Sequence, residues 1–191
     1  MRIFKFGGAS VKDADGVRNL VRVLKHEGTS NTLVVVSAMG KMTNAFETIV
    51  PTYLYDEQQL KSALNFVEDY HRAIVNELFD KEEEIFQEIN RLFGKIQGFL
   101  IQNTSKDYNY IYDQIVSFGE LLSTKIISHY LIKSGIDNRW LDIRNIIKTD
   151  ASYRNANVNW EGTIENVKSI ETQNLYVTQG FIAADKEKNT T

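Results

Sequence analysis

The sequence predicts an α/β fold whose mainly parallel sheet is sandwiched by helices. Three short apolar runs, at 2–6, 33–36 and 175–178, have the length and the β-branched or aromatic content of strands. Helical patterns separate these runs, and strands that alternate with helices favour a parallel sheet. Each run ends at small or glycine-containing residues, and ligands in such folds bind beyond the carboxyl ends of strands.

The first run delivers Lys5 into the paired glycines Gly7 and Gly8, which Ser10 follows. Glycine permits positive φ and close backbone approach, so this turn is able to present N–H groups to an anion beside the lysine ammonium. A helical pattern begins just after the turn and stops at Gly28, and its N-terminus would add positive partial charge. Two interpretations follow from these residues alone: a phosphate site or a plain tight turn.

The second run ends at 37–40, and a helix is expected to open near Lys41 or Thr43, with Pro51 near its end. Residues 56–102 have helical periodicity without a clear strand. Residues 107–135 continue as a long helical region that Gly119 and Glu120 interrupt. We therefore expect a helix-rich stretch over about 56–135, packed against the sheet.

The last third of the chain returns to short elements. Residues 139–142 and 146–148 are predicted to be strands, 153–159 a polar loop and 161–170 a helix. The strand at 175–178 ends in Gln179 and Gly180. We expect its end to converge with the corners Gly7-Gly8 and Ser37-Ala38 around one crevice, because parallel strands end at the same edge.

Composition limits the classes of function. The chain has 191 residues, a formal charge of −3 and no cysteine. The acidic balance argues against nucleic acid as the main partner, and the lack of cysteine excludes disulfides, thiolate metal sites and a cysteine nucleophile. No stretch has the length of a signal peptide core or of a membrane span, so we expect a cytoplasmic protein without a membrane partner.

Several common motifs are absent. The Gly40-Lys41 pair is not a phosphate-binding loop of the P-loop class, because Val35 stands at the upstream glycine and Met42 where Ser or Thr should follow. No stretch has the three glycines of a dinucleotide-binding turn, and the histidines have no metal-ligand spacing. Glu120 lies among apolar residues beside a glycine, and a site role competes with an exposed position or a structural ion pair.

Four spaced blocks resemble the aspartate kinases, members of the amino acid kinase family. The blocks are Lys5-Phe6-Gly7-Gly8-Ala9-Ser10-Val11, Val34-Val35-Val36-Ser37-Ala38-Met39-Gly40-Lys41-Met42-Thr43-Asn44, Ser117-Phe118-Gly119-Glu120-Leu121-Leu122-Ser123 and Val177-Thr178-Gln179-Gly180-Phe181-Ile182. Leu141-Asp142-Ile143-Arg144 and residues 149–160 are also similar to the family. The resemblance runs from end to end in the family's order, and it implies the amino acid kinase fold.

The resemblance implies phosphoryl transfer from ATP, with Mg²⁺ on the nucleotide, to the β-carboxylate of L-aspartate. The product of this reaction would be 4-phospho-L-aspartate, and the reaction would be the first step toward lysine, threonine and methionine. Lys5 matches the lysine at the transferring phosphates, and the phosphate-binding turn matches Gly7, Gly8 and Ser10. The substrate-binding positions match Ser37, Thr43 and Glu120, where Glu120 would hold the α-amino group. No metal ligand of the protein is implied.

Two departures from the family accompany the resemblance. Ala9 stands where the family usually has threonine, which removes one hydroxyl from the phosphate turn. Residues 1–191 match the N-terminal part of the catalytic domain, so we expect the remaining catalytic part and the ACT domains to be absent, the piece alone to be nearly inactive, and the full-length enzyme to be a homo-oligomer.

Alternatives stay open beside the aspartate kinase interpretation. One is another amino acid kinase, acting on glutamate, acetylglutamate, carbamate or a nucleotide monophosphate. The other is a non-catalytic nucleotide-binding fragment.

Overall fold

The computed structural model describes residues 1–171 and 173–191. The elements follow one another as β1 (Arg2–Phe6), the 3-10 helix η1 (Gly8–Val11), α1 (Ala14–Glu27), β2 (Thr32–Val36), α2 (Met42–Tyr55), α3 (Glu57–Leu78), α4 (Glu84–Gln102), α5 (Tyr108–Val116), α6 (Phe118–Lys133), β3 (Arg139–Leu141), the 3-10 helix η2 (Ile143–Asn145), α7 (Trp160–Lys168) and β4 (Leu175–Gln179). The alternation of strands and helices that the sequence predicts is therefore present.

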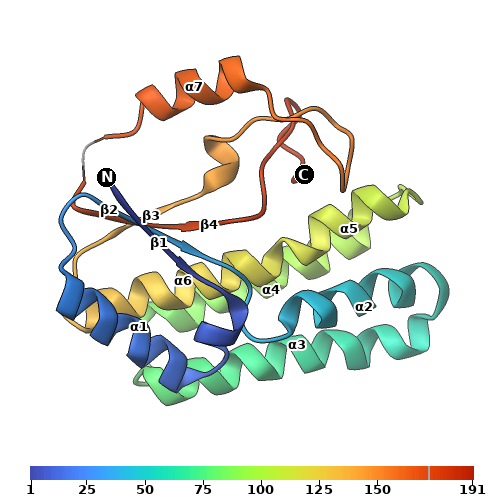
Figure 1. Cartoon of the computed structure of the whole chain (residues 1–191). Helices are drawn as coiled ribbons and strands as arrows, with labels where there is room; N and C mark the ends of the chain where they lie inside the picture. Colours follow the sequence, from blue (N-terminus) through green and yellow to red (C-terminus); the bar gives the residue numbers. More distant parts are fainter. Residues whose placement is uncertain (172) are drawn as a thin grey trace.

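The four strands form one parallel sheet in the order β1-β2-β4-β3 (Figure 1). Phe6 pairs with Val36, and Val36 pairs with Gln179, so three strands end level with one another. β1 is an edge strand, and the alternation of its side chains leaves Ile3 and Lys5 exposed while Phe4 and Phe6 pack against the core. The parallel sheet of the α/β prediction is confirmed.

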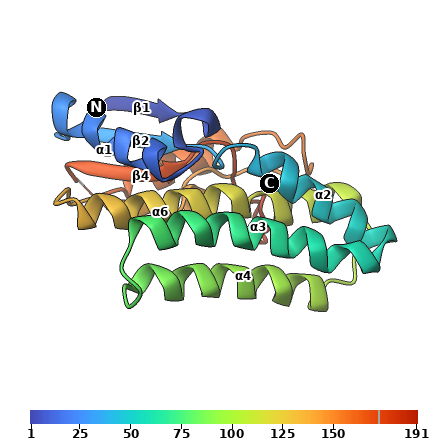
Figure 2. The same ribbon diagram turned by 90° about the horizontal axis from the view of Figure 1, so that it is seen from below.

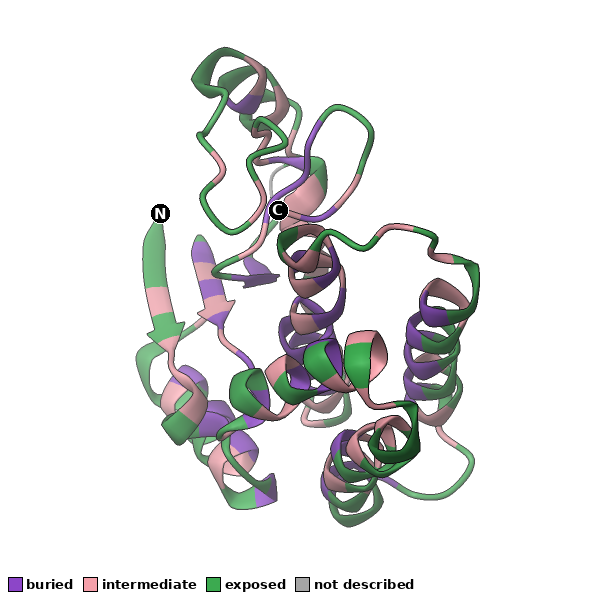
Figure 3. Cartoon of the chain, turned by 90° about the vertical axis from the view of Figure 1, so that its right-hand side faces the viewer, coloured by how far each residue is buried: buried purple, intermediate pink, exposed green. Residues whose placement is uncertain are grey.

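Helix α6 lies directly against the sheet and contacts β2, β3 and β4. Buried residues surround this helix on every side, as expected for a helix enclosed between the strands and other helices. Helices α2, α3 and α4 form the helix-rich part, with α4 farthest from the strands (Figure 2). In Figure 3 the buried residues gather where these helices face one another, whereas the strand that begins at the N-terminus is mostly exposed.

On the other side of the sheet lies α7, opposite to α6 (Figure 1). Asn159 caps its N-terminus by accepting a hydrogen bond from the Gly162 N–H. Its apolar side chains Trp160, Ile164 and Val167 are exposed. Helix α7 is thus a covering element with little burial of its own, and the predicted helix at 161–170 is confirmed.

Two predicted elements differ from the structure. The 107–135 helical region breaks at Ser117, between α5 and α6, rather than at Gly119 and Glu120, which lie inside the first turn of α6. Residues 146–148 are not a strand: β3 ends at Leu141 because the Asp142 carboxylate accepts from the Arg144 N–H and starts η2. Residues 146–148 keep only an isolated bridge, from Lys148 to Ala184.

Pro51 lies within the last turns of α2, so the helix passes through the proline before ending at Tyr55. Gly135, with a φ of 79°, follows α6 as predicted. No helix of the described chain has both the length and the apolar content needed to cross a membrane.

Candidate functional site

The carboxyl ends of β1, β2 and β4 lie side by side, as the sequence predicts. Beyond the strands, the Ser37 N–H donates to the Phe6 carbonyl at 3.1 Å, and the Gly40 N–H donates to the Gly8 carbonyl at 2.9 Å. These bonds extend the β1–β2 pairing into the loops that follow. The turn after β1 and the loop after β2 are therefore one connected surface.

In the turn after β1, packing requires glycine at position 8 but not at position 7, and neither glycine has a positive φ. Gly7 has a φ of −75°, and neither it nor Gly8 is among the residues with positive φ, so the turn does not use the left-handed conformation that glycine permits. A Cβ at Gly8 would lie 2.7 Å from the carbonyl oxygens of Ala38 and Gly40. A Cβ at Gly7 would meet nothing within 4 Å. Gly8 permits close loop packing, and Gly7 leaves open space above the turn.

The N-terminus of α1 does not face the turn as an open positive end. Between them lies η1, and the Asp13 carboxylate caps α1 by accepting from the Gly16 N–H at 2.8 Å. The helical segment that directly follows the turn is therefore η1, and α1 begins only after the Asp13 cap. Lys5 and Ser10 are both exposed at this edge of the sheet, and the Ser10 N–H donates to the Gly7 carbonyl.

The loop after β2 carries Ser37, Gly40 and Thr43. Gly40 has a φ of 54°, so this is the glycine whose conformation the site requires. Ser37 is half-buried, and its carbonyl accepts from the Ser123 hydroxyl of α6 at 2.9 Å. Thr43 is exposed in the first turn of α2, a helix that begins after Lys41 without a side-chain cap. The first N–H groups of α2 lie at the same edge of the sheet as Lys5.

Glu120 points from α6 to the end of β4 and is 7% exposed. Its Oε2 accepts hydrogen bonds from the Gly180 N–H at 2.9 Å and the Phe181 N–H at 3.0 Å. Burial raises the pKa of the carboxyl above its usual value, while the bonds from these N–H groups and the charge of Lys5 act in the opposite direction on the pKa. Glu120 is therefore neither an exposed helix residue nor part of a structural ion pair with another described residue.

The two N–H groups orient the Glu120 carboxylate through one oxygen. Among the described residues no hydrogen bond to the other oxygen, Oε1, is present. A carboxylate held in this way suits recognition of an ammonium group.

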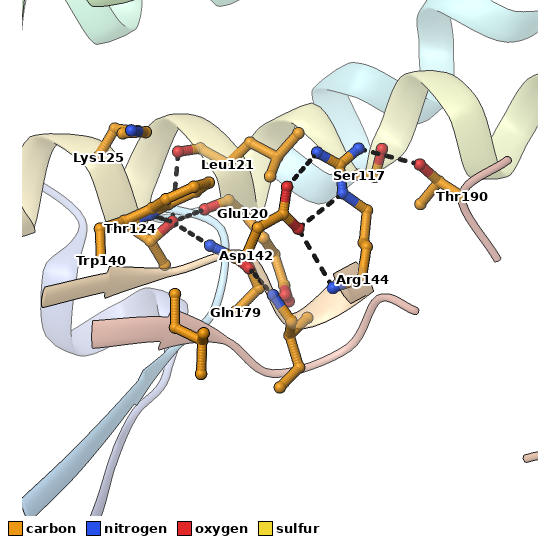
Figure 4. A network of polar contacts seen from close by, with 12 residues as sticks. Ser117, Glu120, Leu121, Thr124, Lys125, Trp140, Asp142, Arg144, Gln179 and Thr190 are labelled. Carbon is orange, nitrogen blue, oxygen red and sulfur yellow. Dashed lines mark hydrogen bonds and ion pairs between the residues drawn. The ribbon is translucent and has the colours of Figure 1, made fainter. Parts of the chain in front are cut away.

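Behind Glu120 lies a buried polar network, shown in Figure 4. The Thr124 hydroxyl donates to the Glu120 carbonyl at 2.7 Å and accepts from the Gln179 amide at 2.8 Å and from the Trp140 indole N–H at 2.9 Å. The Gln179 oxygen in turn accepts from the Ile143 N–H at 2.9 Å. Because Gln179 precedes Gly180 directly, the network fixes the backbone that binds Glu120.

The structure thus brings together Lys5, Gly7, Gly8, Ser10, Ser37, Thr43 and Glu120 at one edge of the sheet. Neither Thr124 nor Gln179 is predicted from the sequence to support the site. Gln179 carried a signal, since it is a polar residue inside a strand that is buried along its whole length. Within residues 1–171 and 173–191, no group of three or more acidic or histidine side chains is arranged to hold a metal ion.

A sequence model described as the Amino acid kinase family matches residues 1–190. The chain belongs to the amino acid kinase family. This finding confirms the family expected from the four sequence blocks.

Aspartokinases are among the relatives of this chain. The chain is 26% identical over 194 residues to lysine-sensitive aspartokinase 3 of Escherichia coli K12, covering 99% of this chain and 42% of the relative. It is 27% identical over 194 residues to the chloroplastic bifunctional aspartokinase/homoserine dehydrogenase 1 of Arabidopsis thaliana, covering 95% of this chain and 21% of the relative. The chain thus spans less than half the length of the relatives it matches.

The fold is similar to that of a solved structure over its whole length. The crystal structure of E. coli aspartokinase III in complex with aspartate and ADP matches with a TM-score of 0.88 and 25% identity. The match covers 100% of this chain and 43% of that chain. The amino acid kinase fold is therefore present, and the structural neighbour is a kinase crystallised with an amino acid and a nucleotide.

Proposed function

We propose that the full-length protein transfers the γ-phosphoryl group of ATP to the β-carboxylate of L-aspartate. The observation that carries this proposal is the Glu120 carboxylate, clamped by the Gly180 and Phe181 N–H groups within electrostatic range of Lys5. An oriented carboxylate suits the ammonium of an amino acid, and an exposed lysine at a glycine turn suits phosphate. The similarity to aspartokinases supports aspartate as the amino acid.

The chemistry needs no general base. The β-carboxylate of aspartate has an ordinary pKa of about 3.9, so it is ionised at neutral pH and has no proton to lose. One of its oxygens attacks the γ-phosphorus, the bond from that phosphorus to the β,γ-bridging oxygen breaks, and ADP leaves. The product is 4-phospho-L-aspartate, an acyl phosphate. The barrier is the approach of two anions, so catalysis rests on positioning and charge neutralisation.

The residues of the site divide this task. Lys5 would neutralise charge on the transferring phosphoryl group, with the turn from Gly7 to Ser10 beside it. Ser37 and Thr43 would bind aspartate from the neighbouring loop, and Glu120 would bind its α-ammonium. Gly7 fits this role, because the space above it is open to a ligand.

Mg²⁺ would arrive with the nucleotide. When bound, the ion supplies charge neutralisation on the phosphates. The exposed cation Lys5 and the open turn suit an anionic nucleotide on which the metal is carried. No acidic ligand of the protein is assigned to the ion in this proposal.

The product suggests a place in metabolism. An acyl phosphate of aspartate is activated for reduction, so we propose that the reaction is the first step toward lysine, threonine and methionine.

A substrate panel tests the proposed function. ADP release by the full-length protein is measured with ATP-Mg²⁺ and L-aspartate, glutamate, acetylglutamate or carbamate. We expect turnover with aspartate and little with the others. Faster turnover with another acceptor would assign a different amino acid kinase, and ATP binding in calorimetry without turnover on any acceptor would make the protein a non-catalytic nucleotide binder.

A further inference from the structure

A tyrosine of the helix-rich part contacts the candidate phosphate turn from outside the sheet. The Tyr70 hydroxyl, on α3, donates a hydrogen bond to the Lys12 carbonyl. Lys12 is the residue at which η1 ends, immediately before the Asp13 cap of α1. The far end of the turn after β1 is thus bound to a helix 58 residues later in the sequence.

The same hydroxyl also lies against the loop after β2. A Cβ at Gly40 would lie 2.6 Å from the Tyr70 hydroxyl oxygen and 3.5 Å from the Lys12 Cβ. The Gly40 N–H donates to the Gly8 carbonyl at 2.9 Å, and a Cβ at Gly8 would lie 2.7 Å from the Gly40 carbonyl. Gly8, Gly40 and the Tyr70 hydroxyl are therefore stacked without room for a side chain between them.

Tyr70 is itself held firmly. Its ring makes an edge contact with the buried His71, at a centroid distance of 5.4 Å, and α3 packs along α2 and against α1. A tyrosine hydroxyl is protonated at neutral pH because its ordinary pKa is about 10, and burial raises the pKa of Tyr70 further, so the hydroxyl can donate this hydrogen bond. The Tyr70 hydroxyl therefore links α3 to the turn after β1 and to the loop after β2, and we call this link, from Tyr70 to Lys12 and Gly40, the strut.

We propose that Tyr70 is a positioning residue that sets the spacing between the phosphate turn and the aspartate loop. This inference rests on the proposed function, in which residues 7–10 hold the phosphates of ATP and residues 37–43 hold aspartate. Tyr70 contacts the far end of the first segment and the tightest point of the second.

In-line phosphoryl transfer depends on this spacing. The attacking carboxylate and the γ-phosphorus are held by different loops, and a misplacement of about 1 Å can cost up to about 100-fold in rate. Loss of the strut should therefore lower kcat more than it weakens either substrate's binding. A purely structural role would instead lower stability without separating kcat from KM.

The test compares Tyr70→Phe with Tyr53→Phe in the full-length protein. Tyr53 is a matched control, because its hydroxyl also donates to a backbone carbonyl, that of Asn103, at 3.2 Å and away from the strand ends. We expect kcat to fall about tenfold in Tyr70→Phe, with both KM values changed by less than about twofold and no such loss in Tyr53→Phe. Unchanged kcat in Tyr70→Phe, or an equal loss in the control, would overturn the proposal.

Amide hydrogen exchange tests the strut without any substrate. In Tyr70→Phe the amides of residues 8–13 and of Gly40 should exchange about tenfold faster than in the wild type, while in Tyr53→Phe they should not. Unchanged exchange overturns the proposal even if the enzyme is active. Absence of aspartate phosphorylation in the wild type is a separate result, which removes the proposed function and with it the catalytic meaning of the strut.

A double-mutant cycle that combines Gly40→Ala with Tyr70→Phe tests the contact between the two positions. In the wild-type background the added Cβ both strains a positive φ and collides with the Tyr70 hydroxyl, whereas in the Tyr70→Phe background the collision with the hydroxyl is gone. We expect the loss of kcat from Gly40→Ala to be about threefold smaller in that background. Additive losses would contradict direct contact between the two positions.

Discussion

The two sides of the candidate site are held in place by different kinds of contact. The turn side, consisting of Lys5, residues 7–12 and Gly40, is held by backbone hydrogen bonds, close glycine contacts and the Tyr70 hydroxyl. The clamp side, consisting of Glu120, Thr124, Gln179 and the Gly180 and Phe181 N–H groups, is held by buried side chains.

The difference matches the ligands that we propose for each side. Phosphate oxygens spread over several atoms and suit an array of N–H groups with a mobile cation, whereas an ammonium is a single charge that suits one oriented carboxylate. Substitutions on the turn side should therefore affect the phosphoryl group, and substitutions on the clamp side the amino acid.

Lys5→Ala should cause the largest loss on the turn side. It removes a charge that would stabilise the transferring phosphoryl group, and kcat should fall by about 100- to 1000-fold. Lys5 is exposed, so the free energy of unfolding should barely change. The measurement is ADP release by the full-length protein, with the exposed Lys25→Ala on α1 as the control. Unchanged turnover would remove Lys5 from the site.

Acid should weaken the support beneath the turn side. Burial lowers the pKa of His71 from 6.5 to about 4, and its ring contacts Tyr70, Phe46 and Phe93. The pKa of His71 is lower in the folded than in the unfolded protein, so neutral His71 makes its full contribution to folding stability above the unfolded pKa. It is lost as pH falls from 6.5 toward 4, by about 1.4 kcal/mol per pH unit and about 3 kcal/mol in all.

Urea unfolding at several pH values measures this loss. His71→Leu should make stability less dependent on pH between the two pKa values, while the exposed His26→Gln should leave the slope as it is. An unchanged slope in His71→Leu would show that His71 does not carry the acid sensitivity.

Glu120→Gln should act on the clamp side only. The amide oxygen can still accept from the Gly180 and Phe181 N–H groups, but the negative charge for the ammonium is lost. We expect the KM for aspartate to rise about 10- to 50-fold, with that for ATP nearly unchanged, and the exposed Glu165→Gln on α7 to change neither.

Stability shows whether Glu120→Gln acts through binding or through folding. Burial raises the folded pKa of Glu120, so its contribution to stability is present at low pH and is lost as pH rises through that pKa. The neutral amide should therefore leave the protein at least as stable near neutral pH. Equal losses for both ligands together with a lower unfolding midpoint would indicate a folding role.

The two glycines of the turn should differ although they are neighbours. Gly8→Ala places a Cβ against two backbone carbonyls and should cost about 1 to 2 kcal/mol of unfolding free energy. Gly7→Ala meets open space at a φ of −75° and should change it by less than about 0.5 kcal/mol. Denaturant unfolding of both variants measures the difference, and equal destabilisation would contradict the packing described for the turn.

Local patterns predicted the elements that end at the site better than the contacts that support it. The strand runs, their small-residue ends and the glutamate of the third block were visible in the sequence, because strand content and turn residues act over a few positions. The 146–148 run failed because β-type composition does not reveal that Asp142 starts a 3-10 turn first.

The supporting contacts were out of reach because they join distant positions. Thr124 meets Gln179 across 55 residues, and Tyr70 meets Lys12 across 58. The need for glycine at position 8 was out of reach for the same reason, since it comes from the loop at Ala38 and Gly40. Only the fold shows that Gly40 is required for its backbone conformation and Gly8 for the close approach of a neighbouring loop.

The central claim is that Glu120 recognises the ammonium of an amino acid whose carboxylate is phosphorylated on the other side of the site. Succinate, which lacks the amino group, tests it directly when hydroxylamine traps the acyl phosphate. The wild-type full-length protein should prefer L-aspartate over succinate by about 100-fold in kcat/KM, and Glu120→Gln should lose most of that preference. A Glu120→Gln enzyme that still prefers aspartate by the wild-type factor would contradict the account.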